Sequence, residues 1–151
     1  MGRKMISEPR LLYAVAVLAF VADRLLKWSV MHIGVGWGPV SFSLYENAGL
    51  MFSIPVPYAN LLVGISVVVY CGLIGGLAAL TYRGSRFTPP LFLITLGATS
   101  NLYDRLAHGA IIDFLIFFGR SAINLADVMI VVGLVLIILQ SDVLQAKRKR
   151  G

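Results

Sequence analysis

Apolar residues occur along this chain in four long runs that are separated by shorter, more polar stretches. The runs cover residues 11–32, 59–81, 87–106 and 122–140. A run of about 20 apolar residues is long enough for a helix to cross a bilayer. The pattern therefore predicts a helical membrane protein with four transmembrane helices, organised as one domain over residues 1–151.

Two stretches between these runs have patterns that are typical of β-strands. Val40, Phe42 and Leu44 alternate with polar residues. Residues 111–118 form an apolar run, interrupted by Asp113, that is too short to span a bilayer. We expect a strand or strand pair on the membrane face at the first stretch, unless it is an ordinary hairpin loop. At the second we expect a strand or a re-entrant segment.

Glycine, threonine and proline add detail to the second and third runs. Gly64, Gly72 and Gly76 lie at multiples of four residues, which gives one small-residue face for close helix packing within the chain. Thr88 stands directly before two prolines, a pattern that is typical of a helix start with Thr88 as the N-cap.

Composition and charge support the membrane interpretation and orient the helices. Hydrophobic residues make up 58% of the chain and charged residues 13%, against about 25% charged in soluble domains. Basic residues lie before the first run, between the second and third, and after the fourth, whereas residues 33–58 contain none. This distribution predicts that both termini are cytoplasmic. We interpret the basic residues 147–150 as a lipid-headgroup anchor, with no nucleic-acid partner.

Three ionisable residues inside the runs are expected to be structural. Asp23 and Lys27 are four residues apart, so they share a helix face and can form an ion pair. Asp104 directly precedes Arg105, and we expect this cation to be its partner.

Asp113 and Asp127 have no adjacent cation, and they flank the short loop before the fourth run. Ionisable groups at membrane depth are costly and usually mark a working site. Two carboxylates that meet in an apolar site would share one proton, so one could act as a base toward water and the other as an acid. That is aspartic-protease chemistry at the outer membrane face, and it needs no metal or cofactor.

Other chemistries find little support in the sequence. His32 and His108 are too few and too scattered for a zinc site, and no HExxH motif occurs. No Ser-His-Asp or Cys-His set is available. A small transporter or lipid-binding protein that uses Asp113 and Asp127 as proton or cation sites remains an alternative to hydrolysis.

The polar motifs resemble those of the bacterial lipoprotein signal peptidases, the signal peptidase II family, over nearly the whole chain. The matching elements are Asp23 with Lys27, Asn47-Ala48-Gly49 with Phe52-Ser53, Gly97 with Asn101, Asp104 and Arg105, Gly109 with Asp113-Phe114, and Asn124-Leu125-Ala126-Asp127. The resemblance implies that Asp113 and Asp127 are the catalytic pair. It implies that the residues lining or supporting the site are Asn47, Gly49, Gly97, Asn101, Arg105, Asn124 and Ala126.

The resemblance also implies a fold, a substrate and a location. The fold is a bundle of four transmembrane helices with a small β-cradle on the outer, extracytoplasmic face. The substrate is a diacylglyceryl-modified prolipoprotein, which is cut before its lipidated cysteine in the bacterial inner membrane. We expect a monomer, because nothing in the sequence demands a larger assembly. A catalytically inactive relative that acts as a scaffold is a further alternative. The chain departs from the usual family pattern at Met51, Leu96, Ser100 and Ile123, and its outer lid at residues 54–58 is short.

Overall fold

The computed structural model describes residues 9–33, 40–49, 59–117 and 121–148. Four helices and three strands form in the order α1 (Pro9–Ile33), β1 (Val40–Asn47), α2 (Ala59–Tyr82), α3 (Thr88–His108), β2 (Ile111–Phe117), β3 (Ser121–Ile123) and α4 (Leu125–Arg148). The mainly helical fold and the small sheet that the sequence predicts are confirmed. The motif at Phe52-Ser53 and the short lid at residues 54–58 lie outside the described residues.

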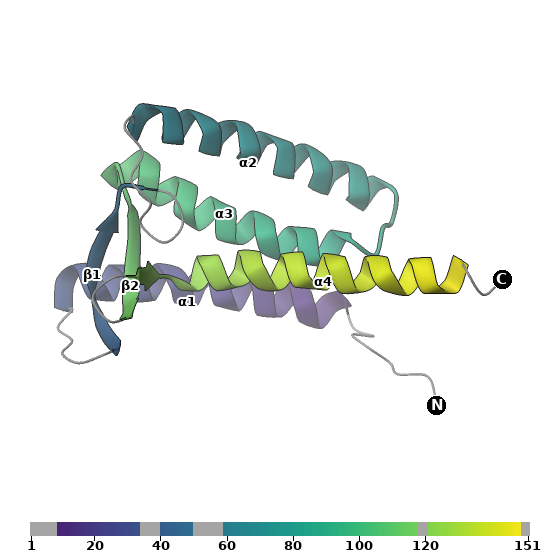
Figure 1. The fold of residues 1–151 in the computed structure, drawn as a ribbon, viewed down its shortest axis with the longest axis horizontal. Helices are drawn as coiled ribbons and strands as arrows, with labels where there is room; N and C mark the ends of the chain where they lie inside the picture. Colours follow the sequence, from purple (N-terminus) through teal and green to yellow (C-terminus); the bar gives the residue numbers. More distant parts are fainter. Residues whose placement is uncertain (1–8, 34–39, 50–58, 118–120, 149–151) are drawn as a thin grey trace.

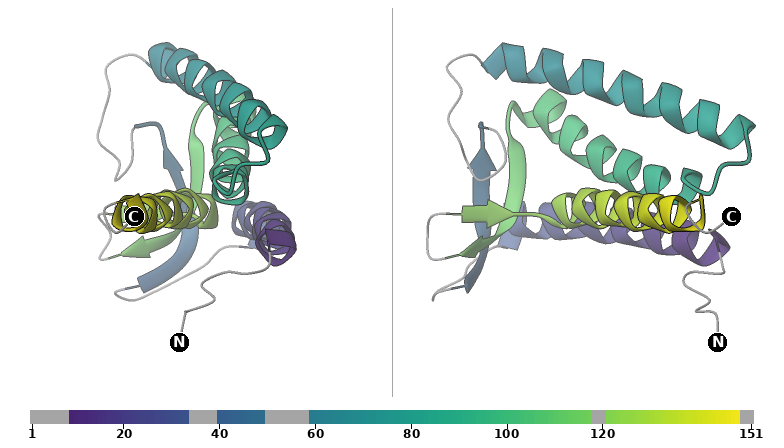
Figure 2. Two further views of the ribbon diagram at one scale, coloured as in Figure 1. Left: turned by 90° about the vertical axis from the view of Figure 1, so that its right-hand side faces the viewer. Right: turned by 45° about the vertical axis from the view of Figure 1, so that its right-hand side comes forward.

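The helices lie side by side, with the sheet across one end of the bundle (Figure 1). Helix α3 is central and packs against α1, α2 and α4, whereas α2 packs mainly against α3. Figure 2 shows α2 at the edge of the bundle. The start of α1 and the end of α4 lie at the end that is farthest from the sheet (Figure 1).

Large apolar side chains cover the outside of the helices. Leu18 is 68% exposed on α1, and Val68 is 72% exposed on α2. Within the described residues, Leu61–Tyr82 and Leu125–Asp142 are long and apolar enough to cross a membrane. Such a surface suits an apolar solvent, in which lateral exposure of leucine and valine carries no penalty.

The core consists of two small clusters at different depths. Ala16, Leu93 and Met129 meet where α1, α3 and α4 pack together. Val30, Ile112 and Phe114 join the end of α1 to strand β2. The second cluster holds the sheet against the bundle and so fixes the position of β2 relative to the helices.

Strand β2 is the middle strand of an antiparallel sheet with the order β1-β2-β3. The alternating stretch that starts at Val40 is therefore a strand as predicted, and β2 is its partner. The register changes by one residue between Phe42 and Tyr45, so that Asn47 pairs with Ile111 and Tyr45 with Asp113. Without this bulge Glu46 would take the place of Asn47, because cross-strand partners share one face of a sheet.

The fourth helix begins later than the sequence pattern predicts. Residues 121–123 form strand β3, in which Ser121 pairs with Phe117 and Ile123 with Leu115. Helix α4 therefore starts at Leu125 rather than at residue 122, and it continues past residue 140 to Arg148. Three residues are too few to show a strand period in the sequence.

The third helix also differs at both ends from the expectation. Phe87 occupies the N-cap position and makes no side-chain capping bond, so Thr88 is the first helical residue and not the cap. The helix runs past residue 106 to His108, where Gly109 takes a left-handed conformation (φ 76°) and donates its N–H to the carbonyl oxygen of Arg105. This conformation favours glycine and ends the helix.

The small-residue face of α2 is mostly unpacked among the described residues. A methyl group added at Gly76 would lie 3.6 Å from Leu91, but nothing lies within 4 Å at Gly64 or Gly72. Among the described residues, the expected packing within the chain is therefore found at Gly76 but not at Gly64 or Gly72, because α2 packs mainly against α3.

Candidate active site

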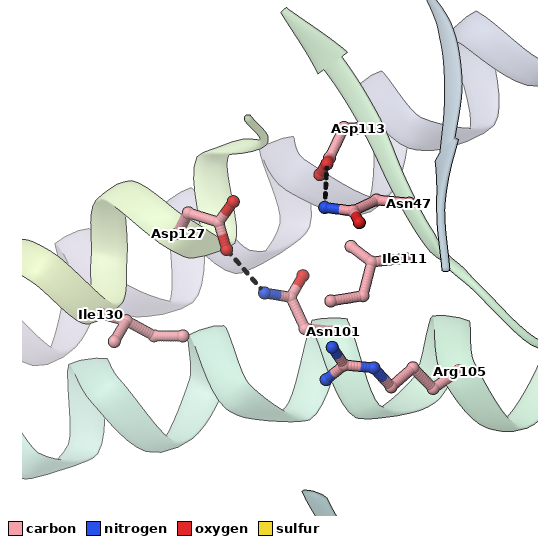
Figure 3. A pocket seen from close by; sticks show the side chains of 7 residues that line it. All are labelled: Asn47, Asn101, Arg105, Ile111, Asp113, Asp127 and Ile130. Carbon is pink, nitrogen blue, oxygen red and sulfur yellow. Dashed lines mark hydrogen bonds between the residues drawn. The ribbon is translucent and has the colours of Figure 1, made fainter. Parts of the chain in front are cut away.

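A cavity of about 220 Å³ opens where the sheet meets the helices. Figure 3 shows that its lining side chains come from β1, β2, α3 and α4. The lining residues are Asn47, Asn101, Arg105, Ile111, Asp113, Asp127 and Ile130. Five of the polar residues predicted from the sequence therefore meet at one cavity, although they are far apart along the chain.

Asp113 reaches this cavity from β2 and is 1% exposed. The side-chain amide of Asn47 donates to its Oδ2 atom (3.1 Å), and the amide of Asn124 donates to its Oδ1 atom (2.6 Å). Burial is the largest influence on the pKa of Asp113 and raises it to about 6, with the nearby charge of Asp127 acting in the same direction. The hydrogen bonds from Asn47 and Asn124 act against this rise in pKa.

Asp127 lies in the first turn of α4 and is fixed there by a reciprocal capping arrangement. Its backbone N–H donates to Oδ1 of Asn124 (2.9 Å), and the backbone N–H of Asn124 contacts Oδ2 of Asp127 (3.4 Å). Such a pair satisfies the first free N–H groups of a helix. The amide of Asn101 donates to Oδ1 of Asp127 (2.8 Å) from α3. The start of α4 thus orients one of the two carboxylates at the cavity.

A second group of charged residues lies beside the cavity, between α1 and α3. Asp23, Lys27 and Asp104 are all fully buried. Lys27 Nζ is 3.2 Å from Asp23 Oδ2 and 2.7 Å from Asp104 Oδ2, so the expected ion pair within α1 is present. Arg24 forms a further ion pair with Asp104 (2.6 Å). We call Asp23, Arg24, Lys27 and Asp104 the ionic cluster.

Arg105 is not the partner of Asp104, which corrects the expectation from the sequence. Its guanidinium donates instead to Ser66 Oγ (2.9 Å) and to the carbonyl oxygen of Gly49 (3.1 Å). Residues that are adjacent in a helix point in directions about 100° apart, so they do not face each other. The N–H of Gly49 in turn donates to Oδ1 of Asn47 (3.0 Å).

Gly97 and Ala126 allow the ionic cluster and the cavity to lie close together. The backbone N–H of Ala126 donates to Oδ1 of Asp23 (2.9 Å), which ties the start of α4 to α1. A methyl group at Gly97 would lie 2.6 Å from the carbonyl oxygen of Ala126. Only glycine therefore fits at residue 97 at this separation of α3 and α4.

Four residues at or beside the site were not identified from the sequence. Arg24 and Ser66 hold Asp104 and Arg105, while Ile111 and Ile130 form apolar walls of the cavity. Ser100, noted only as a departure from the family pattern, donates to Asp23 Oδ2 (2.5 Å) and accepts a hydrogen bond from Arg24 (3.0 Å). Arg24 could have been identified from the sequence, because a basic residue inside an apolar run needs a partner of opposite charge.

The described residues offer no cluster of three or more His, Cys, Asp or Glu side chains that could hold a metal ion. His108 is exposed, as is the ring of His32, which stacks on Trp28. These contacts place one buried and one partly buried carboxyl group at the cavity, each held by neutral amide donors, beside a guanidinium group.

Comparison with known proteins places these features in a family context. The family model for signal peptidase (SPase) II matches residues 15–143. The lipoprotein signal peptidase of Vibrio campbellii is 36% identical over 140 residues, which cover 82% of this chain and 83% of the relative. That of Symbiobacterium thermophilum is 29% identical over 143 residues, covering 87% and 94% of the two chains.

The fold is similar to that of solved bacterial membrane enzymes. One such structure, determined by the in meso method at 2.3 Å resolution, has a TM-score of 0.69 and 20% sequence identity. The match covers 100% of this chain and 96% of that one. At this level of identity the likeness concerns the fold alone.

Proposed function

Because this chain belongs to the signal peptidase II family, we propose that it removes signal peptides from diacylglyceryl-modified prolipoproteins by cutting before the lipidated cysteine. We assign the catalysis to Asp113 and Asp127. The observation that carries this assignment is that both carboxyl groups line one cavity and accept hydrogen bonds from asparagine amides, while no ion pair reaches either of them among the described residues.

The proposed reaction is the hydrolysis of a peptide bond by a carboxyl pair that holds one proton. The ionised carboxylate takes a proton from water, and the water oxygen attacks the scissile carbonyl carbon. The protonated partner gives its proton to the carbonyl oxygen, which leaves a neutral tetrahedral diol. Collapse of the diol breaks the C–N bond: the ionised carboxylate takes the proton of one diol hydroxyl, while its protonated partner gives its proton to the leaving amine of the cysteine. One water is consumed, and the pair ends with one proton as it began.

Arg105 and Asn47 would hold the substrate backbone beside this pair. The contacts of Arg105 with Ser66 and Gly49 use two of its five N–H groups, and its guanidinium lines the cavity. The remaining N–H groups can donate to a substrate carbonyl oxygen and stabilise charge that develops there.

We propose that all four helices cross the bacterial inner membrane, with both termini in the cytoplasm. Helices of 21 to 25 residues are long enough for this. The sheet and the cavity would then lie at the outer leaflet, because Arg83 and Arg86 lie in the α2–α3 connection, at the end of the bundle away from the sheet. Residues 1–151 would act as one monomeric peptidase domain, with membrane lipids around it.

Cleavage by the purified protein tests this function directly. The substrate is a diacylglyceryl-modified prolipoprotein in detergent or liposomes, and release of the signal peptide is followed as a shift on a gel. We expect the wild-type chain to cut it and Asp127→Asn to lose about 10³-fold in rate, within the range for general acid–base groups. EDTA should leave the rate unchanged.

Two results would overturn the proposal. Absence of cleavage by the wild-type chain would remove the peptidase function, and proton or cation flux through liposomes would then favour the transport alternative. Equal cleavage by wild type and Asp127→Asn would remove the carboxyl pair from the chemistry.

A further inference from the structure

The three asparagines around the carboxyl pair all present their NH₂ group to an aspartate. A side-chain amide can be turned by 180°, so its orientation is set by what the oxygen end contacts. The oxygen of Asn47 accepts the N–H of Gly49, and that of Asn124 accepts the N–H of Asp127. Both partners are backbone N–H groups, which can only donate.

Asn101 differs because side chains fix its oxygen. Oδ1 of Asn101 accepts from Lys27 Nζ (3.0 Å) and from the amide of Asn124 (3.1 Å), while its Nδ2 donates to Asp127 Oδ1 (2.8 Å). Of these two donors, only the lysine carries a charge. A charged donor makes a hydrogen bond that is about twice as strong as a neutral one.

Several contacts besides the one to Asn101 fix the position of the Lys27 ammonium group. It is fully buried, and its other contacts are Asp104 Oδ2 (2.7 Å), Asp23 Oδ2 (3.2 Å) and Ser100 Oγ (3.3 Å). An ammonium group has hydrogens to donate and no lone pair to accept with. Turning Asn101 over would therefore place NH₂ against NH₃⁺, at a cost that the buried site cannot relieve with water.

We propose that Lys27 is a positioning residue of the active site, acting through Asn101: its ammonium fixes the Asn101 amide so that this amide always donates to Asp127. The inference rests on the proposed peptidase function. It gives Lys27 a task beyond that of a counter-ion for Asp23 and Asp104, because Lys27 is the one member of the ionic cluster that donates a hydrogen bond to Asn101 among the described residues.

The first measurement compares Lys27→Met with Arg24→Met in the cleavage assay. Each variant removes one cation from Asp104, but Arg24 contacts Asp104, Ser100 and the ring of Tyr103 instead of Asn101. We expect Lys27→Met to lower kcat by about 10- to 100-fold with KM within about 2-fold, the effect of one charged hydrogen bond. Arg24→Met should keep kcat within about 3-fold. Equal losses in kcat for the two variants would overturn the inference.

A double-mutant cycle with Asn101→Ala separates positioning from general support. If Lys27 acts through Asn101, the variant Lys27→Met/Asn101→Ala should cut at nearly the rate of Asn101→Ala alone. Multiplied losses in the double variant would mean that Lys27 acts independently of Asn101, and the inference would fall.

Folding is checked by thermal unfolding of each variant in detergent. If Lys27→Met does not fold, the same cycle is measured in the Asp104→Asn background, with Lys27→Gln in place of Lys27→Met. The two exchanges together remove one charge of each sign, and Asp104→Asn alone is the reference. If the wild-type chain cuts the substrate but the losses in rate multiply in the double variant, only the inference about Lys27 falls and the proposed function stands. No wild-type cleavage removes the proposed function, and this inference with it.

Discussion

Two pairs of aspartates lie side by side in this protein, and they have opposite surroundings; only Asp127 among them is partly rather than fully buried. Asp23 and Asp104 contact the cations Lys27 and Arg24. Asp113 and Asp127 contact the amides of Asn47, Asn101 and Asn124. The residue type is the same and three of the four side chains are almost fully buried, so we attribute the difference in what each pair can do to their partners.

The two sets of partners favour different charge states. In the ionic cluster two carboxylates face two cations, so all four groups can stay ionised without net charge. In the catalytic pair the amides donate hydrogen bonds but bring no charge, and burial raises the pKa of Asp113 to about 6. In the proposed mechanism these two carboxyl groups hold one proton between them, which is the state that hydrolysis needs.

Exchanging one aspartate of the catalytic pair should give the largest effect on activity. Asp113→Asn keeps the shape of the side chain but can neither take nor give the catalytic proton. We expect cleavage to fall by about 10³-fold. The loss of stability should be limited to about 1–3 kcal/mol, because the new NH₂ group faces one of the two amide donors but adds no charge to the buried site. A fall in unfolding temperature that matches the loss of activity would mean that Asp113 is structural, like Asp104.

The same exchange in the ionic cluster should act on stability. Asp104→Asn leaves Lys27 and Arg24 without their shared carboxylate and weakens the hydrogen bond to the N–H of Ile112. We expect a loss of about 3 kcal/mol in the free energy of unfolding, measured by denaturant titration in detergent. Full stability together with lost cleavage would reverse the roles that we give to the two pairs.

The contact between α3 and α4 that brings the two pairs together can be tested at Gly97. Gly97→Ala places a methyl group 2.6 Å from the carbonyl oxygen of Ala126, so we expect a loss of about 1–3 kcal/mol in unfolding free energy and slower cleavage. Gly64→Ala is the matched control, since no atom of the described residues lies within 4 Å of the added methyl group there. Equal effects of the two variants would show that the close contact is unimportant.

The pH dependence of cleavage should report the raised pKa of Asp113. The pair loses its single proton as pH rises, so we expect the alkaline side of the profile to begin near pH 6, well above the ordinary carboxyl value of 3.8. Asn47→Ala removes a donor that lowers this pKa, and it should move the alkaline side upward by roughly one pH unit. The exposed Glu46 offers a control, because Glu46→Gln should leave the profile in place.

Stability should follow pH in the corresponding direction. The folded protein holds the Asp113 proton more tightly than the unfolded chain does, so this group lowers stability as pH rises from 3.8 to about 6. Asp113→Asn removes this contribution, and its unfolding temperature should vary less over that interval. If the alkaline side of the cleavage profile does not move in Asn47→Ala, the group that titrates there is not Asp113.

The helices and two of the strands could be predicted from the sequence because their signals are local. Apolar runs and the alternation from Val40 predict the four helices and β1. Strand β3 and the bulge in β1 depend on pairing with β2, for which a single strand carries no signal. The bulge matters for the site, since it brings Asn47 rather than Glu46 to the face that carries Asp113.

The sequence predicts which residues form the site but not which of them contact one another. Intramembrane polar residues and family motifs identify Asp113, Asp127 and their asparagines. The predicted ion pair between Asp104 and Arg105 is wrong. The two residues are adjacent in the sequence, but the packing of α1 on α3 brings Lys27 and Arg24 to Asp104 instead. Which side chains meet between helices depends on their relative rotation, and a hydrophobic run does not define that rotation.

The hydrogen bond from Ala126 to Asp23 also bears on when the protein becomes a protease during its synthesis. It joins residues that are 103 positions apart, the first on α1 and the second at the start of α4. A ribosome that adds residues from the N-terminus produces Asp23 long before its partner exists. Asp127, the second member of the proposed catalytic pair, lies on α4 as well. On the proposed roles, the chain therefore gains its complete site only once α4 has been synthesised and packed.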